Sequence, residues 1–328
     1  MNATTHNLQK ISTTQNSFYR LFFILSFVLM TLESRAQNIC NIEQLQRRET
    51  TGMLFAVKEN KQILAYLFGS IHIGYEPIKK LPKPVEVALS QSKKYYVEWH
   101  PDDDKKSRQE ADLIFPDKGV RNLKTVLNAE NYKILSAHLD QLNMSPEARA
   151  SAESLHPNKL IPDLIDPDPP ELKKSTPLDH LLLMSVLMHG QELGGIETTQ
   201  EHWLPIAAIT TDEQINLLAA ESLKELSCNT CRKGRAQLSL CTLELTRLGE
   251  ADQLVAILEK FNDSRPIAKA HMGTVVNARN AGMTKKIASL LRKEPTFFVN
   301  IGSLHLGGKL GVLQGLRDLG YTVEKVTE

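Results

Sequence analysis

Two periodicities alternate along the chain, and the strand-like one occurs near both ends. The apolar runs 54–57 and 63–68 are joined by a polar turn, which predicts a β-hairpin with a buried second strand. Further short apolar runs predict strands at 95–99, 194–198, 296–301 and 321–326. Most of the predicted strands therefore lie in the first and last thirds of the chain.

Helical periodicity dominates the middle of the chain. The clearest helices are predicted at 123–142 and 177–189, the second ending at Gly190, and shorter ones at 85–94 and 309–319. A proline- and aspartate-rich stretch at 162–170 predicts a surface loop. The order of elements predicts an α/β (α+β) fold, in which pseudo-symmetric duplicated β-α-β units form a mixed sheet. A large helical insertion at about 105–292 would separate the two units.

The duplication is predicted from a motif that occurs at both ends. The sequence Gly-Ser-x-His-x-Gly occupies 69–74 and again 302–307. Each copy follows a predicted strand and leads through a helix to a strand that reads Tyr-x-Val-Glu, at 95–98 and 321–324. A match that recurs in the same context favours an internal repeat over coincidence.

The histidines of the two copies, His72 and His305, predict a ligand site. Ligands of open α/β sheets bind beyond the carboxyl ends of the strands, and glycine there permits a positive φ or a close approach to the ligand. Imidazole is the commonest metal ligand, and a carboxylate would complete the site. Glu98 is the best-placed candidate and Glu197 the next. The alternative is that both histidines only hydrogen-bond within their loops, and that Glu324 faces solvent.

Composition and absent motifs narrow the function. The chain has 328 residues, of which 41% are hydrophobic and 23% charged, so wholesale disorder is excluded. A formal net charge of +1 gives no electrostatic case for nucleic-acid binding. Neither H-E-x-x-H nor G-x-S-x-G occurs, which argues against a zincin and an ordinary α/β-hydrolase. The seven remaining histidines among residues 73–300 show no ligand spacing: His100, His138, His156, His180, His189, His202 and His271.

The N-terminal segment resembles a secretory signal. Arg20 precedes an apolar core at 21–32, and Ser34-Arg35-Ala36 resembles a small-x-small cleavage site. We expect a signal peptide at 1–36, a mature single domain at 37–328 without a transmembrane segment, and a periplasmic or secreted location. The apolar core is too short to span a bilayer as a helix. The alternative is an uncleaved anchor or a buried helix.

Four cysteines fit an exported protein: Cys40, Cys228, Cys231 and Cys241. They allow three pairings, among which the sequence does not choose. The Cys-x-x-Cys at 228–231 is open to interpretation as half a zinc site or a redox pair, but no second well-spaced pair follows. Structural disulfide bonds are the favoured prediction.

Several segments together resemble the TraB/GumN family, which also includes the Tiki proteins of animals. They are residues 67–74, 96–98, 178–179, 195–198, 279–280 and 298–308, and the resemblance extends over about 50–326. It implies a fold related to erythromycin esterases and ChaN-like iron-handling proteins. It also implies a similarity to metal-dependent peptidases, whose two motif histidines and a glutamate correspond to His72, His305 and Glu98.

The same resemblance implies roles for further residues. Glu197 corresponds to the family's Glu-Thr motif and Arg279 to its Arg-Asn motif, whereas Ser70 and Ser303 stand where the family often has threonine or alanine. Glu98 would be a ligand or the general base. Arg279 has no lone pair and would instead stabilise an oxyanion or bind a substrate carboxylate, unless it only forms a surface salt bridge.

We therefore expect an exported metal-dependent hydrolase that uses Mn, Co or Zn and acts on a peptide or small-molecule substrate through peptide or ester bonds. One alternative is a non-catalytic protein that binds a metal, haem or peptide in the same crevice. Another is a regulator that has kept the fold for protein–protein contacts. Loss of both histidines would abolish function in the first two cases and leave the third unaffected.

Cleavage of the signal peptide can be measured on the full-length chain. Protein recovered from the cell envelope should begin at Gln37, because the small residues at 34 and 36 mark the cleavage site. Peptide mapping by mass spectrometry identifies the N-terminus. An intact Met1 on the envelope-associated protein would contradict this prediction.

Overall fold

The computed structural model describes most of the chain after the predicted signal peptide. The described residues are 40–71, 74–76, 80–99, 109–110, 113–114, 121–141, 144–154, 176–208, 211–226 and 228–327. The predicted signal peptide, the motif histidine His72 and the predicted loop at 162–170 lie outside them.

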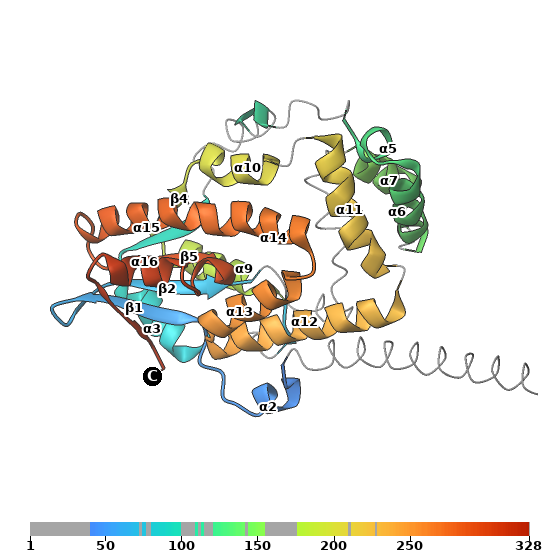
Figure 1. Ribbon diagram of the computed structural model, residues 1–328. Coiled ribbons are helices and arrows are strands. Elements are labelled where there is room, and N and C mark those ends of the chain that lie inside the picture. The colour runs from blue at the N-terminus through green and yellow to red at the C-terminus, as the bar shows by residue number, and fades with distance from the viewer. Residues whose placement is uncertain are drawn as a thin grey trace, which may run out of the picture.

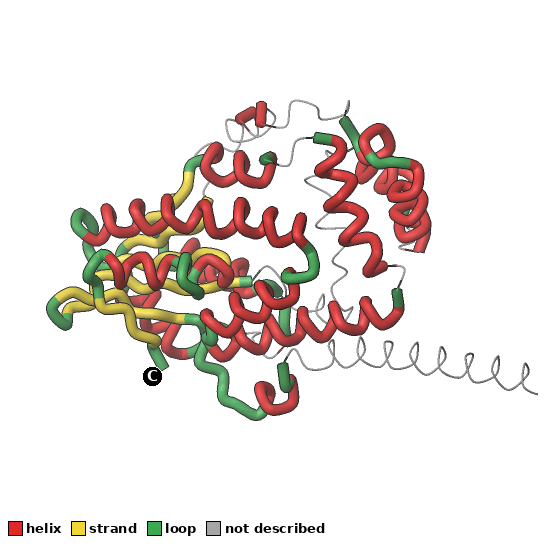
Figure 2. Tube along the Cα trace, viewed as in Figure 1, coloured by secondary structure: helices red, strands yellow, loops and turns green. Residues whose placement is uncertain are grey.

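A six-stranded mixed sheet forms the centre of the protein, with strand order β4-β3-β5-β2-β1-β6 (Figure 1; Figure 2). The strands are β1 (Leu54–Glu59), β2 (Gln62–Ser70), β3 (Lys94–Trp99), β4 (Glu192–Glu197), β5 (Phe297–Gly302) and β6 (Thr322–Lys325). Strands β4, β3, β5 and β2 are mutually parallel, and β1 is antiparallel to both β2 and β6. The predicted α/β fold with a mixed sheet is confirmed.

The hairpin of β1 and β2 follows from its sequence. Asn60 and Lys61 both have positive φ, as a tight two-residue hairpin turn requires. Along β2 successive side chains enter opposite cores: Leu67 packs on one face of the sheet and Phe68 on the other. A continuous apolar run therefore reflects burial of both faces.

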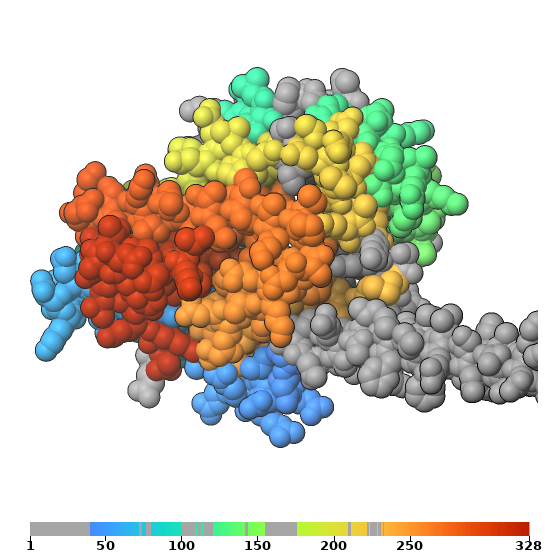
Figure 3. Space-filling view, viewed as in Figure 1, coloured from blue at the N-terminus to red at the C-terminus, as the bar shows by residue number. Residues whose placement is uncertain are grey.

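Helices cover both faces of the sheet. Helices α3 (Lys83–Gln91) and α9 (Leu178–Met188) pack on one face, and α13 (Ala251–Asn262), α15 (Ala278–Leu291) and α16 (Val312–Asp318) pack on the other. Figure 3 shows the C-terminal helices, in orange and red, forming a continuous surface. Among the described residues, no helix is both long and apolar enough to cross a membrane.

Four helices form a separate apolar cluster beside the sheet (Figure 1). They are α5 (Leu123–Val126), α6 (Ala129–Gln141), α7 (Pro146–Glu153) and α11 (Asp212–Leu226). The single helix predicted at 123–142 is wrong. The Asn128 side chain accepts a hydrogen bond from the backbone N–H of Asn131 at 2.9 Å, which starts a second helix instead of continuing the first.

The two motif copies lie side by side, as the repeat requires. Parallel pairing of β2 with β5 sets Ser70 opposite Gly302. Helices α3 and α16, which follow the two copies, pack on opposite faces of the sheet. The two copies diverge after that, because β3 joins β5 at the centre whereas β6 joins β1 at the edge. Glu324 accordingly lies on the edge strand, more than half exposed and ion-paired with Lys58, as expected for a solvent-facing residue.

Helix α12 (Asn229–Leu248) contains one cysteine of each disulfide bond, and the residues before β1 are attached to it. The bonds join Cys40 to Cys241 and Cys228 to Cys231, so the predicted disulfide bonds are confirmed and the pairing is decided. Arg247, which is 4% exposed, donates to the carbonyls of residues 45 and 48 and to a buried carboxylate of its own helix, that of Glu244.

Glu244 also connects this N-terminal attachment to the first motif. Its carboxylate, 1% exposed, accepts a hydrogen bond from the Tyr75 hydroxyl, and Tyr75 directly follows the motif glycine at position 74. Burial and the adjacent Glu244 carboxylate raise the pKa of Tyr75 to about 12, so this hydroxyl keeps its proton at physiological pH. The loop after β2 is therefore fixed to α12 by a buried polar contact.

Replacing Arg247 with methionine should destabilise the protein strongly. The change leaves the Glu244 carboxylate buried without its guanidinium partner, which costs roughly 3–5 kcal/mol. Arg48→Met is the matched control, because Arg48 pairs with Glu250 at the surface and such pairs contribute at most about 1 kcal/mol. Urea unfolding at neutral pH measures both variants, and equal losses would contradict the role assigned to Arg247.

Candidate metal and active site

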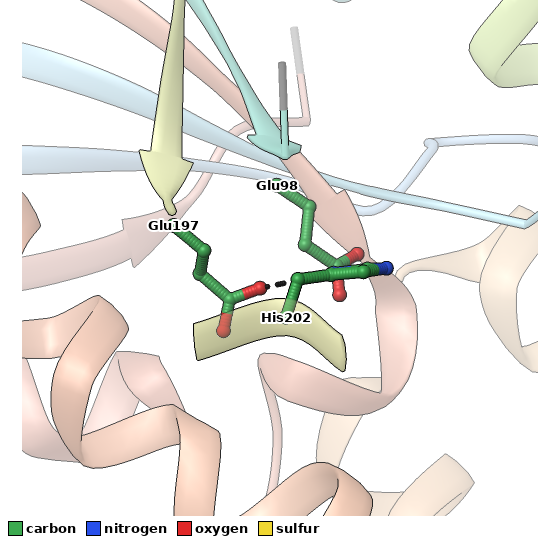
Figure 4. A group of neighbouring side chains, drawn as sticks. All are labelled: Glu98, Glu197 and His202. Atoms are coloured by element: carbon green, nitrogen blue, oxygen red, sulfur yellow. Dashed lines mark hydrogen bonds and ion pairs between the residues drawn. The ribbon is translucent and has the colours of Figure 1, made fainter. Parts of the chain in front are cut away.

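Side chains from two neighbouring strands and one helix converge at the carboxyl end of the sheet (Figure 4). Glu98 is the penultimate residue of β3, and Glu197 is the last residue of β4. His202 projects between them from α10 (Thr199–Ala207). One ligand atom from each of these three residues lies within 4.8 Å of the other two.

The turn from β4 into α10 places His202. Thr198 is the N-cap of α10, and its side chain and that of Glu201 form a reciprocal capping box. The helix therefore begins directly after Glu197, and its first turn carries His202 over the strand end. The search for metal-ligand spacing in the sequence did not find His202. The capping sequence Thr-x-x-Glu at 198–201, between Glu197 and His202, indicates that a helix begins there and brings the histidine back towards the glutamate.

Arg279 binds all three of these side chains. Its Nε donates to Glu197 Oε1 at 2.9 Å, and its Nη2 contacts Glu197 Oε2, Glu98 Oε1 and His202 Nδ1. The residue is 7% exposed, so the alternative of a surface salt bridge is wrong. Arg279 of α15 thus joins Glu98 of β3 to Glu197 of β4, although the three elements are far apart in the sequence. We call these ion pairs, with His202 beside them, the ion-paired centre.

A π-helical turn precedes Arg279. Helix α14 (Pro266–Met272) runs through this turn, η3 (Gly273–Asn277), into α15. The turn changes the register between α14 and α15, and the Arg279 Nη1 donates to the carbonyl of Val275 within it at 3.2 Å. Single π-turns inside helices often occur at functional sites.

The centre carries more negative than positive charge. Glu98 and Glu197 both contact the single guanidinium of Arg279. Two carboxylates and one guanidinium leave one net negative charge when the imidazoles are neutral. A further cation would balance this charge.

The contact between His305 and Glu98 would also be favoured by a cation. Its Nδ1 lies 2.6 Å from Asn280 Oδ1, and the Asn280 amide nitrogen donates to the carbonyl of Leu310, which sets the amide orientation. The Nδ1 atom is therefore a donor. Its Nε2 lies 3.1 Å from Glu98 Oε1, where a neutral imidazole would direct a lone pair at a carboxylate. A proton on Nε2 or a metal ion would make this contact favourable.

Burial and ion pairing shift the pKa values in the centre. Burial opposes ionisation of Glu98, but the hydrogen bond from His305 and the charges of His305 and Arg279 hold its pKa well below the usual range. Burial likewise opposes ionisation of Glu197, and the hydrogen bonds from Arg279 and His202 lower its pKa. Burial disfavours the charge on Arg279, yet its two carboxylate partners raise its pKa. Both glutamates are therefore ionised at neutral pH.

Glycine in the motif serves close approach and not a positive φ. Gly302 has a φ of −54°, and its N–H lies 3.3 Å from Glu98 Oε2. In the other copy, a Cβ on Gly69 would come within 2.7 Å of the side chains of Met53 and Leu306. The close approach at Gly69 is to side chains of the protein core, which differs from the two predicted reasons, a positive φ or a close approach to a ligand.

Aromatic side chains border the centre on the α10 side. The Trp99 ring stacks on His202 with centroids 5.6 Å apart, and Trp203 packs edge-on against His202 at 4.9 Å. The Trp99 indole N–H donates to Thr199 Oγ1 at 3.2 Å. These rings fix the His202 imidazole in place and shield one side of the ion pairs from water.

Four of the five residues predicted for the site come together. Glu98, Glu197, Arg279 and His305 are linked by direct contacts. The fifth, His72, lies outside the described residues, two positions beyond the end of β2. Sequence reasoning did not identify His202 or Asn280 as members of the site. Carboxylate and imidazole ligands together with the excess of negative charge fit a divalent metal ion.

Comparison with known proteins places the chain in a family. The model described as the TraB/PrgY/gumN family matches residues 53–325. No curated protein matches the chain, and neither does any solved structure. The matched range contains every residue of the centre.

Replacing Arg279 with methionine should change how stability depends on pH. In the metal-free wild type, Glu98 and Glu197 have depressed pKa values, so stability falls as pH decreases below their ordinary value of 4.5. In the variant both carboxylates lose the guanidinium that lowers their pKa values, so these values rise, although His305 still contacts Glu98. We expect a loss of roughly 3–5 kcal/mol at pH 7 that becomes smaller as pH falls.

Urea unfolding between pH 7 and pH 4 in the presence of a chelator measures this difference. The double variant Arg279→Met/Glu197→Gln is the control, because it removes one of the unpaired charges and should recover part of the lost stability. A stability gap that stays constant with pH would show that the two carboxylates do not depend on Arg279.

Proposed function

This chain belongs to the TraB/PrgY/gumN family, and from its site we propose that it is an exported metal-dependent hydrolase that cleaves peptide or ester bonds. The observation that carries the proposal is the contact between His305 Nε2 and Glu98 Oε1. Asn280 fixes the opposite ring nitrogen of His305 as a donor, so the contact is favourable with either a proton or a metal ion on Nε2, and we assign it to a metal ion because the two carboxylates outnumber the one guanidinium. The resemblance of the family to metal-dependent peptidases also supports a metal-dependent hydrolase.

We propose that four residues hold the metal: His305, Glu98, His72 and Glu197. The carboxyl ends of β2 and β5 are paired, so the residues after both strands belong to the same end of the sheet. A bound divalent ion at this place would lower the pKa of a water molecule and polarise a carbonyl group. Manganese, cobalt and zinc all accept such oxygen and nitrogen ligands.

Glu98 suits the role of ligand better than that of general base. Its pKa lies well below the usual range, so the carboxylate is ionised at neutral pH but weakly basic. Asn280 positions His305 by accepting from its Nδ1, an arrangement typical of histidines that bind metals.

Arg279 would serve the reaction through its charge. Among the described residues, its Nη1 has one acceptor, the carbonyl of Val275, and therefore retains a hydrogen for the substrate. A guanidinium next to the scissile carbonyl would stabilise the oxyanion that develops there. Its ion pairs with Glu98 and Glu197 hold it in that position before the substrate binds.

Two further features of the proposal concern the whole chain. We propose that residues 37–328 act as one domain, since the strands around the site come from both ends of the chain. We also propose cleavage after Ala36 and a periplasmic or secreted location, which two disulfide bonds support.

Metal binding by the purified mature protein tests the proposed function. The wild type should bind one Mn²⁺, Co²⁺ or Zn²⁺ per chain in titration calorimetry, and metal analysis should account for the same ratio. His305→Ala and His72→Ala should each weaken binding by at least about tenfold, since each removes a ligand. His189→Ala is the matched control, because His189 is exposed and bonds to a carbonyl of its own helix.

Activity then distinguishes an enzyme from a binding protein. Peptide and ester substrates should be hydrolysed by the metal-loaded wild type, and both a chelator and Glu98→Gln should abolish hydrolysis. Binding without turnover would favour the non-catalytic alternative. Absence of metal binding, or unchanged binding by His305→Ala, would overturn the proposal.

A further inference from the structure

The disulfide bond between Cys228 and Cys231 lies apart from the ion-paired centre, at the start of α12. Cys228 is the N-cap of this helix, and Cys231 lies in its first turn. The helix is 20 residues long. Its N-terminus therefore presents backbone N–H groups that have no acceptor within the helix, and the positive end of the helix dipole, to the two sulfur atoms.

Direct contacts and local charge both favour a thiolate at Cys228. Its Sγ accepts a hydrogen bond from the backbone N–H of Cys231 at 3.2 Å. The first turn of α12 contains no acidic residue. Cysteine thiolates are stabilised at helix N-termini and in Cys-x-x-Cys motifs, and this site combines both features.

The second disulfide bond provides a comparison within the same helix. Cys241 is fully buried, and Cys40, itself partly exposed, packs against the sheet core, so one sulfur atom of the Cys40–Cys241 bond is shielded from solvent. Cys228 and Cys231 are both partly exposed. An external thiol therefore reaches the Cys228–Cys231 bond more readily than the Cys40–Cys241 bond.

We propose that Cys228 and Cys231 form a thiol–disulfide exchange site whose co-reactant is an external dithiol. A thiolate of the dithiol attacks Cys228 Sγ, forms a mixed disulfide and displaces Cys231 as a thiolate. The second thiol of the dithiol then attacks the mixed disulfide and releases Cys228. The protein disulfide gains two electrons and two protons, and the dithiol becomes a disulfide.

The order of the sulfur atoms follows from their places in the helix. Cys228 lies at the cap, outside the helical turn, whereas Cys231 is held within it. When Cys228 is released from the mixed disulfide, the hydrogen bond from the Cys231 N–H stabilises its thiolate. The bond lies at the start of α12, next to the corner with α11, which belongs to the four-helix cluster (Figure 1).

Stepwise reduction of the folded full-length mature protein tests the proposal. Samples are incubated with increasing dithiothreitol, acid-quenched and alkylated, and the cysteine peptides are quantified by mass spectrometry, with circular dichroism as the control for folding. We expect Cys228–Cys231 to open at least about tenfold faster than Cys40–Cys241, before any loss of secondary structure.

Two single variants test which sulfur reacts. Cys231→Ser treated with glutathione disulfide should form a mixed disulfide at Cys228 about tenfold faster than Cys228→Ser forms one at Cys231. The double variant Cys40→Ser/Cys241→Ser should keep the reactivity of the remaining pair. The proposal is overturned if both bonds open together, if opening requires unfolding, or if the two single variants react at equal rates. None of these outcomes depends on metal binding at the ion-paired centre.

Discussion

The burial of two carboxylates against one guanidinium is the constraint on which the centre depends. Glu98 and Glu197 would each be costly to ionise in the protein interior, and Arg279 would be costly to bury alone. Together the three groups offset most of these penalties. Because they come from β3, β4 and α15, the ion pairs hold the edge of the sheet to the helix that covers it. The net negative charge that remains makes the centre receptive to a further cation.

The parallel arrangement of four strands makes this convergence possible. Strands β4, β3, β5 and β2 all end on the same side of the sheet, so the residues at their carboxyl ends become neighbours whatever their distance in sequence. The two copies of the glycine–histidine motif occupy the two central positions. Close packing of Gly69 against core side chains, and of Gly307 against the backbone of Ala251, explains why the motif carries glycine at these two positions.

Helix α12 connects features that are distant in the chain. Its C-terminal half holds the N-terminal segment through Cys241 and Arg247, and Glu244 binds Tyr75 beside the first motif. Its N-terminus carries the partly exposed disulfide bond at the corner with α11. One end of the helix is thus embedded in the hydrophobic interior, and the other presents a pair of sulfur atoms to reagents. The same element combines a structural and a chemically reactive cross-link.

Local patterns in the sequence indicated the strands, the hairpin, most helices and the candidate site residues Glu98, Glu197 and His305, whereas Arg279 was indicated only by the family resemblance. These features depend on periodicity, turn residues and a repeated motif, which act over a few neighbouring positions. The break at Asn128 was missed because a side-chain cap competed with an otherwise helical pattern.

Only the tertiary structure decided the pairing of the cysteines, the contact of His305 with Asn280, and the place of His202 beside Arg279. These depend on strand order, helix packing and burial, which bring together residues more than 70 positions apart in the case of His202 and Arg279. Burial also turned Arg279 from an apparent surface residue into the centre of a charged network, because its partners lie on strands that no local pattern places next to it.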